Sequence, residues 1–139
     1  MFVLDTDIAT LLLREHERVL VRVAKVEAHL VYLSLVTRLE LIRGRIDAVI
    51  KASTADELLN ASAGLGLTEE FVASRPIVTV TEAVAEQFDA LRVLKKLNKM
   101  SAGDRLQAAL ALAHSATLVT RNTKDFAAVP NLKLDDWAD

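Results

Sequence analysis

The chain has 139 residues and a mass of 15.2 kDa, with 52% hydrophobic and 26% charged residues, which suits one compact domain spanning residues 1–139. It contains no cysteine, and this excludes disulfides, thiol nucleophiles and zinc–thiolate sites. The formal net charge of −2 excludes a protein that binds polyanions over its whole surface, because such binding requires many Lys and Arg side chains.

Short apolar runs alternate with longer helical patterns along the chain. The predicted strands are Phe2–Asp5, Val31–Ser34, Ile77–Val80, Thr117–Thr120 and Leu132–Leu134. The predicted helices are Asp7–Arg14, Glu17–Ala28, Thr37–Lys51, Thr54–Val72, Thr81–Leu97 and Ala102–His114. This alternation predicts an α/β fold with a mostly parallel sheet covered by helices on both faces.

Three segments have distinctive sequences. Gly64 and Gly66 predict an end or a kink in the fourth helix. The sixth helix, residues 102–114, is apolar nearly all round, which indicates a central position. Near the C-terminus, Trp137 predicts a terminal packing element.

No apolar run approaches the roughly 20 residues that are needed to span a bilayer. The first residues also lack the basic and apolar segments of a secretory signal. We therefore expect a soluble, unprocessed protein without a membrane partner, and the absence of cysteine fits a cytoplasmic location.

Polar residues follow two of the predicted strands. Asp5 ends the first strand, and Thr120, Asn122 and Asp125 end or follow the fourth. In open parallel sheets, ligands bind in the crevice beyond the carboxyl ends of the strands. These side chains are therefore candidates for one shared site.

Two further acids have a second interpretation. Glu40 and Asp104 each stand three residues after a hydroxyl, at Thr37 and Ser101, which is also the spacing of a capping box at a helix start. Both acids nevertheless lie on helices next to the predicted strands, so both could face the crevice lined by Asp5. Capping and catalysis stay open for each of them.

A shared site for Asp5, Glu40 and Asp104 would need a cation. Like charges about 4 Å apart repel by about 4 kcal/mol per pair at an effective dielectric constant near 20. A helix N-terminus offsets only about 0.3–1 kcal/mol. All-oxygen ligation without cysteine favours Mg²⁺ or Mn²⁺, and such an ion suits the hydrolysis of phosphodiester bonds.

Several motifs in order resemble one known family. DTD at Asp5–Asp7, TRLELIRG around Glu40, GDRLQAALALA at Asp104, LVTRNTKDF and the closing LKLDDW are together similar to a PIN-domain nuclease of the VapC toxin type. The resemblance covers nearly the whole chain. It implies a three-layer α/β/α sandwich and a Mg²⁺- or Mn²⁺-dependent endoribonuclease. It also implies a homodimer and a cognate antitoxin that covers the acidic site.

The resemblance also implies roles for particular residues. Asp5, Glu40 and Asp104 match the three core acids of the family, which are its metal ligands and catalytic residues. In many relatives an aspartate stands at the position of Asn122, and Asp125 is the candidate substitute for that fourth acid. Whether one or two ions bind is left open by this departure.

Neighbouring polar residues are candidates for supporting roles. Thr6, Thr120 and Asn122 could orient carboxylates, whereas buried hydroxyls often only satisfy backbone groups. Asp7 is expected to cap the first helix or to support the site. A local group of basic residues could attract RNA phosphates: Lys95, Lys96, Lys99, Arg105, Arg121 and Lys124.

Two other functions compete with the nuclease. A degenerate PIN module would bind RNA or protein without cleavage, and Asn122 keeps this alternative open. FVLDTDIAT is also similar to the aspartate motif of haloacid-dehalogenase-like phosphohydrolases. That alternative needs an acid shortly after Asp104, and RLQAALALA contains none.

Overall fold

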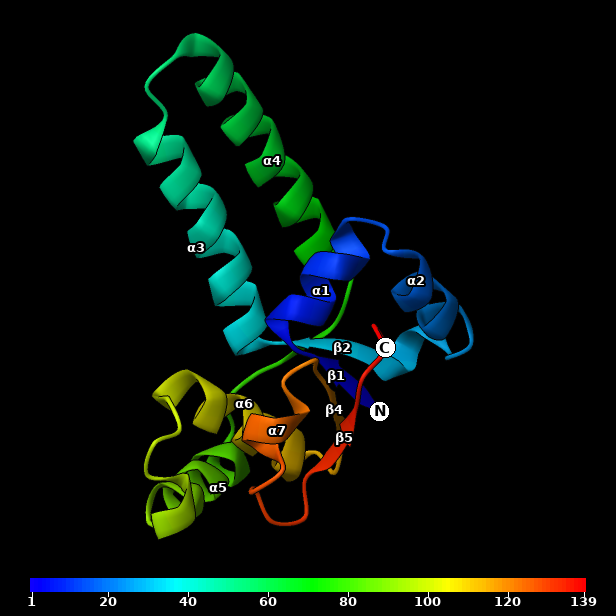
Figure 1. Ribbon diagram of the computed structural model, residues 1–139, viewed down its shortest axis with the longest axis vertical. Coiled ribbons are helices and arrows are strands. Elements are labelled where there is room, and N and C mark those ends of the chain that lie inside the picture. Colours follow the sequence, from blue (N-terminus) through cyan, green and yellow to red (C-terminus); the bar gives the residue numbers. More distant parts are fainter.

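The computed structural model describes residues 1–139, and a five-stranded sheet lies at its centre (Figure 1). Its strands are β1 (Phe2–Leu4), β2 (Val31–Ser34), β3 (Ile77–Val78), β4 (Thr117–Val119) and β5 (Lys133–Asp135). Their spatial order is β3-β2-β1-β4-β5, and every neighbouring pair is parallel. The α/β class with a parallel central sheet is thereby confirmed.

Seven α-helices and two 3-10 helices connect and cover these strands. The α-helices are α1 (Thr6–Leu13), α2 (Glu17–Ala24), α3 (Leu35–Lys51), α4 (Ala55–Ala73), α5 (Glu82–Arg92), α6 (Ala102–Ala113) and α7 (Thr123–Phe126). The 3-10 helices are η1 (Ala28–Leu30) and η2 (Lys95–Leu97). Figure 1 shows α1 and α2 on one side of the sheet and α5 and α6 on the other, while α3 and α4 form a long hairpin that projects from the body.

The core is divided between the two faces of the sheet. Val3 and Leu118 pack into a cluster with residues of α5 and α6, whereas Leu4 and Val119 pack into a second cluster with residues of α1 and α2. All four side chains are fully buried. Successive strand residues point to opposite faces, so a sheet covered on both sides needs apolar residues at every position. This explains the almost unbroken apolar strands and confirms the three-layer arrangement.

The boundary of α3 differs from its prediction. The helix begins at Leu35, and Ser34 is its N-cap, because the Ser34 hydroxyl accepts a hydrogen bond from the backbone N–H of Thr37 at 3.0 Å. Thr37 lies inside the helix instead of at its start. The capping-box interpretation of Glu40 is therefore wrong.

Several other elements are shorter than predicted. The second predicted helix ends at Ala24 and is followed by η1, and the fifth ends at Arg92 and is followed by η2. Strand β3 has only two residues. These boundaries depend on caps and packing that apolar periodicity does not reveal.

The predicted break in the fourth helix is also wrong, because α4 continues through Gly64 and Gly66. No glycine in the chain has a positive φ, so neither residue is used for a turn. A side chain at Gly64 would lie 3.1 Å from the guanidinium of Arg45 on α3. The small residue therefore permits close packing of α4 against α3.

None of the helices combines the length and the hydropathy that a membrane span requires.

Candidate metal-binding and catalytic site

A polar cleft of about 420 Å³ lies beyond the carboxyl end of the central strand β1. It is lined by seven residues, none of them hydrophobic: Asp5, Thr6, Asp7, Glu40, Asp104, Arg121 and Asn122. The three predicted core acids, Asp5, Glu40 and Asp104, thus border the same space. The four carboxylates of its lining make it an acidic cleft.

The topology of the sheet explains why distant residues meet there. Asp5 directly follows β1, and its backbone N–H donates to the carbonyl of Val119 on β4 at 2.9 Å. Glu40 lies on α3, which follows β2, and Asp104 lies in the first turn of α6, which precedes β4. Because β2 and β4 flank β1 in a parallel sheet, these segments come together at one edge.

Three donors from different segments hold the carboxylate of Asp5. Its Oδ1 accepts from the backbone N–H of Thr6 at 2.7 Å and from Nε2 of Gln107 at 3.4 Å. Its Oδ2 accepts from the hydroxyl of Thr120 at 2.8 Å. Burial raises the pKa of Asp5, against the lowering effect of Thr120 and Thr6, and the charges of Asp7 and Asp104 raise it further.

Asp104 lies at the start of α6, where Ser101 is the N-cap and accepts from the backbone N–H of Asp104 at 3.1 Å. Its predicted position at a helix start is therefore confirmed. Burial raises the pKa of Asp104, the Ser101 hydroxyl lowers it, and the charges of Glu40 and Asp125 raise it. Capping uses the backbone of Asp104, so its carboxylate remains available to the cleft.

Glu40 and Asp7 are the more exposed acids of the cleft. The hydroxyl of Thr6 donates to Oε2 of Glu40 at 2.5 Å. Asp7 does not cap α1, because Asp5 occupies the N-cap position, and the predicted capping role of Asp7 is wrong. Thr6 and Thr120 each donate a hydrogen bond to a carboxylate that lines the cleft.

Asn122 and Asp125 form a hydrogen-bonded pair, in which Nδ2 of Asn122 donates to Oδ2 of Asp125 at 2.8 Å. Asn122 lines the acidic cleft. Asp125 instead lines a neighbouring cavity of about 220 Å³, which also borders Asp104. Asp125, the predicted substitute for the fourth acid of the family, therefore lies near Asp104 and does not line the acidic cleft.

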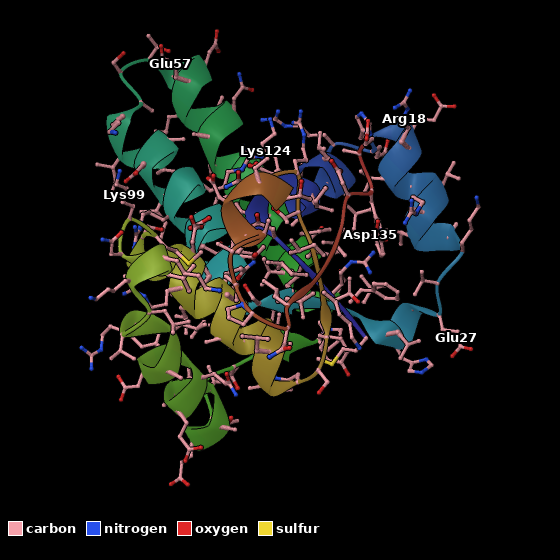
Figure 2. All side chains as sticks on the ribbon, turned by 60° about the horizontal axis from the view of Figure 1, so that its bottom comes forward. Arg18, Glu27, Glu57, Lys99, Lys124 and Asp135 are labelled. Carbon is pink, nitrogen blue, oxygen red and sulfur yellow. The ribbon has the colours of Figure 1, made fainter.

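The basic residues predicted to attract phosphate are distributed unevenly. Arg121 lines the acidic cleft, and Lys96 and Lys99 line the neighbouring cavity. Figure 2 shows Lys99 in the segment before α6 and Lys124 on α7, so these cations come from separate elements. Arg105 is directed elsewhere, because its Nη2 donates to the carbonyl of Met100 and its guanidinium lies 5.7 Å from the ring centre of Phe88.

The donor set of the cleft fits a hard divalent cation in its chemistry, because carboxylate oxygens are the ligands that Mg²⁺ and Mn²⁺ prefer. None of the ion pairs in the structure involves an acid of the cleft. No three acidic, histidine or cysteine side chains are grouped closely enough to ligate one ion. Ligation by three of these carboxylates would therefore need a side-chain rotation, for example of Glu40, which now accepts a hydrogen bond from Thr6.

Gln107 is a site residue that the sequence did not reveal. It lies on α6, is 1% exposed, and contacts Asp5 through its amide. The available signal was a single amide in a helix that is otherwise apolar nearly all round. A buried amide in such a helix requires polar partners, and here those partners belong to the acidic site.

The fold of the chain is similar to that of known proteins. A family model for the PIN domain matches residues 2–132. FitAcB from Neisseria gonorrhoeae is 27% identical with a TM-score of 0.75, over 99% of this chain and 98% of that one. VapBC2 from Rickettsia felis, bound to a DNA fragment from its promoter, is 25% identical with a TM-score of 0.72, over 98% of both chains.

A third solved structure, DNA-bound VapBC from Salmonella typhimurium, is alike in fold. It has a TM-score of 0.79 at 21% identity, over 98% of this chain and 97% of that one. None of the curated proteins matches the chain.

Proposed function

The chain belongs to the PIN-domain family, and on that premise we propose that it is a divalent-metal-dependent endoribonuclease. The observation that carries this proposal is the cleft bordered by Asp5, Glu40 and Asp104, whose carboxylates form no ion pair with a cationic side chain. Family membership counts against the phosphohydrolase alternative, which belongs to a different fold family.

Asp5, Glu40 and Asp104 would hold Mg²⁺ or Mn²⁺ in this cleft. When bound, such an ion lowers the pKa of a coordinated water and polarises a phosphate oxygen. The chain itself supplies the negative charges of the site and holds its carboxylates in position. Asp5 is held by donors from three segments, and Thr6 restrains Glu40.

Arg121 is the side chain best placed to contact the phosphate backbone, because it is the one cation that lines the acidic cleft. Lys96 and Lys99 extend a positive surface along the neighbouring cavity. Asp125 and Asn122 would complete the acidic site on the side of Asp104. RNA would thus be held by local cations despite the net negative charge of the chain.

We further propose that the protein is the toxin of a toxin–antitoxin pair and that it acts in the cytoplasm as one domain of residues 1–139. The similar solved structures are FitAB- and VapBC-type complexes, which supports a cognate antitoxin as a partner of this chain. A homodimer is the proposed assembly of the toxin itself.

A PIN module that binds RNA or protein without cleaving is the second candidate. The absence of a ready-made group of three metal ligands favours it, as does the amide of Asn122 at a position where relatives carry an acid. Metal-dependent cleavage separates the two candidates.

The test is cleavage of RNA by the purified protein with Mn²⁺ and with a chelator. Asp5→Asn and Asp104→Asn should each lower the cleavage rate by roughly 1,000-fold, since losing an ion's stabilisation of several kcal/mol corresponds to about a factor of ten per 1.4 kcal/mol. Asp47→Asn, an exposed acid on α3, is the matched control and should cleave normally. Wild-type rates in Asp104→Asn, with circular dichroism unchanged, would contradict the nuclease proposal.

A further inference from the structure

Gln107 lies at the centre of a buried polar network beneath the acidic cleft. Its side chain is 1% exposed and lies one turn after Asp104 on α6. The amide contacts Ser34 at the end of β2, Thr37 on α3 and Asp5 after β1. One side chain thus connects the three segments that supply the core acids.

The orientation of the Gln107 amide follows from the hydrogens available to its partners. The Ser34 hydroxyl accepts from the backbone N–H of Thr37, and its own hydrogen is directed at Oε1 of Gln107. The Thr37 hydroxyl donates to the carbonyl of Leu4 at 2.9 Å and therefore accepts from Nε2 of Gln107 at 3.3 Å. The second hydrogen of Nε2 is left for Oδ1 of Asp5, at 3.4 Å.

The opposite amide orientation is unfavourable at the Asp5 end, even though the Ser34 hydroxyl could then donate to Thr37 instead. It would place Oε1 of Gln107 against the carboxylate of Asp5, where two acceptors would face each other without a hydrogen between them. In the observed network both hydrogens of Nε2 and the oxygen Oε1 of Gln107 have hydrogen-bond partners, which is the condition under which a buried polar group is stable.

We propose that Gln107 is a positioning residue that holds the Asp5 carboxylate in place for metal ligation. The inference rests on the proposed metal-dependent function. Gln107 restrains Oδ1 of Asp5 while Thr120 restrains Oδ2, so the carboxylate is held from two sides. A neutral amide orients the carboxylate without neutralising it, whereas a Lys or Arg at position 107 would compete with the ion.

The first test is Mn²⁺ binding to the protein alone, by calorimetry or electron paramagnetic resonance. Gln107→Met keeps the shape of the side chain and removes its hydrogen bonds. We expect the dissociation constant for Mn²⁺ to rise about 10- to 100-fold, as for other residues that hydrogen-bond a metal ligand. Thr68→Val is the matched control, because it removes a buried hydroxyl whose partner is Arg45 on the α3–α4 hairpin, and its Mn²⁺ affinity should equal that of the wild type.

The second test needs no metal. In chelator, the melting temperature is compared for Gln107→Met, Asp5→Ala and the double variant. If Gln107 holds Asp5, Gln107→Met should lower the melting temperature less in the Asp5→Ala background than in the wild type. If the two substitutions lower the melting temperature additively, Gln107 does not hold Asp5, and this conclusion is independent of metal binding.

The outcomes separate the two proposals. A wild-type protein that binds no Mn²⁺ counts against the proposed function, and the melting temperatures still decide whether Gln107 holds Asp5. Equal Mn²⁺ affinities in wild type and Gln107→Met, with tight binding in both, overturn the positioning role alone.

Discussion

Asp5 and Asp104 are ionisable groups whose environment favours their neutral form. Burial is the largest cause of the raised pKa of both, and neighbouring carboxylates act in the same direction. When the pKa of an acid is raised in the folded state, its ionisation costs more free energy in the folded than in the unfolded state. The folded protein without a metal ion is therefore destabilised by the charges that the proposed function requires.

This electrostatic strain predicts a pH-dependent stability difference between wild type and Asp104→Asn in chelator. Below the ordinary pKa of 3.8, Asp104 is protonated in both states and its charge contributes nothing. As the pH rises from this value through the raised pKa of the folded state, ionisation of Asp104 destabilises the wild type, and this contribution is absent from Asp104→Asn. Thermal unfolding should thus show the variant melting higher than the wild type at pH 7, with the difference closing near pH 4.

The comparison of the variant with the wild type reports the charge of Asp104 together with its repulsion of Asp5, whose pKa it raises. Asp47→Asn is again the control, because Asp47 is exposed and lies outside the acidic cleft. A constant difference for Asp104→Asn between pH 4 and 7 would show that its charge is not strained.

At the scale of elements, the α3–α4 hairpin shows how one packing contact decides the role of a glycine. Arg45 on α3 donates from Nε to the buried hydroxyl of Thr68 on α4 at 3.0 Å, and its guanidinium lies against Gly64. A side chain at Gly66, in contrast, would meet no atom within 4 Å. The two glycines are both helical, but only the first has a steric function.

Alanine substitutions should distinguish these glycines. Gly66→Ala should stabilise the protein by about 0.5–1 kcal/mol, because alanine favours the helix and meets no neighbour. Gly64→Ala should gain less, since Arg45 must move and its bond to Thr68 is disturbed. Urea unfolding measures both, and an equal gain in the two variants would contradict the packing role of Gly64.

At the scale of the whole molecule, the two ends of the chain meet over one face of the sheet. Trp137 is 1% exposed, and its ring centre lies 5.2 Å from that of Phe2 on β1. Its Nε1 donates to Oδ2 of Asp135 at 2.9 Å, and this carboxylate also pairs with Arg22 on α2. The predicted terminal packing element is thus confirmed, and it covers the central strand of the sheet.

Removal of this aromatic anchor should destabilise the whole fold. Trp137→Ala should lower the free energy of unfolding by about 3–5 kcal/mol, the usual loss for a buried tryptophan. Unfolding in urea should be followed by circular dichroism, because Trp137 is the only tryptophan of the chain. Val93→Ala, at a position 67% exposed, should change stability little. A similarly small change for Trp137→Ala would show that the C-terminus is not part of the core.

The elements and the family could be predicted from the sequence because their signals are local. Apolar runs such as FVL and TLV mark strands buried on both faces, and Ser101 with Asp104 marks the start of α6. The site was predictable where its acids directly follow a strand or begin a helix, as Asp5 and Asp104 do. The cap of α3 was misassigned because Ser34 and Thr37 offer similar hydroxyls, and only the helix geometry selects Ser34.

The sequence by itself therefore determined the order and type of the strands and longer helices, the parallel α/β class and the family, since apolar periodicity and ordered motifs depend on neighbouring residues. Only the tertiary structure decided which polar groups share a space. The order of β2, β1 and β4 brings Glu40, Asp5 and Asp104 to one cleft, places Asp125 in the cavity beside it and turns Arg105 away toward Phe88. The tertiary structure also brings Gln107 to Asp5. A sequence pattern could not reveal this contact, because the two residues lie far apart in the chain.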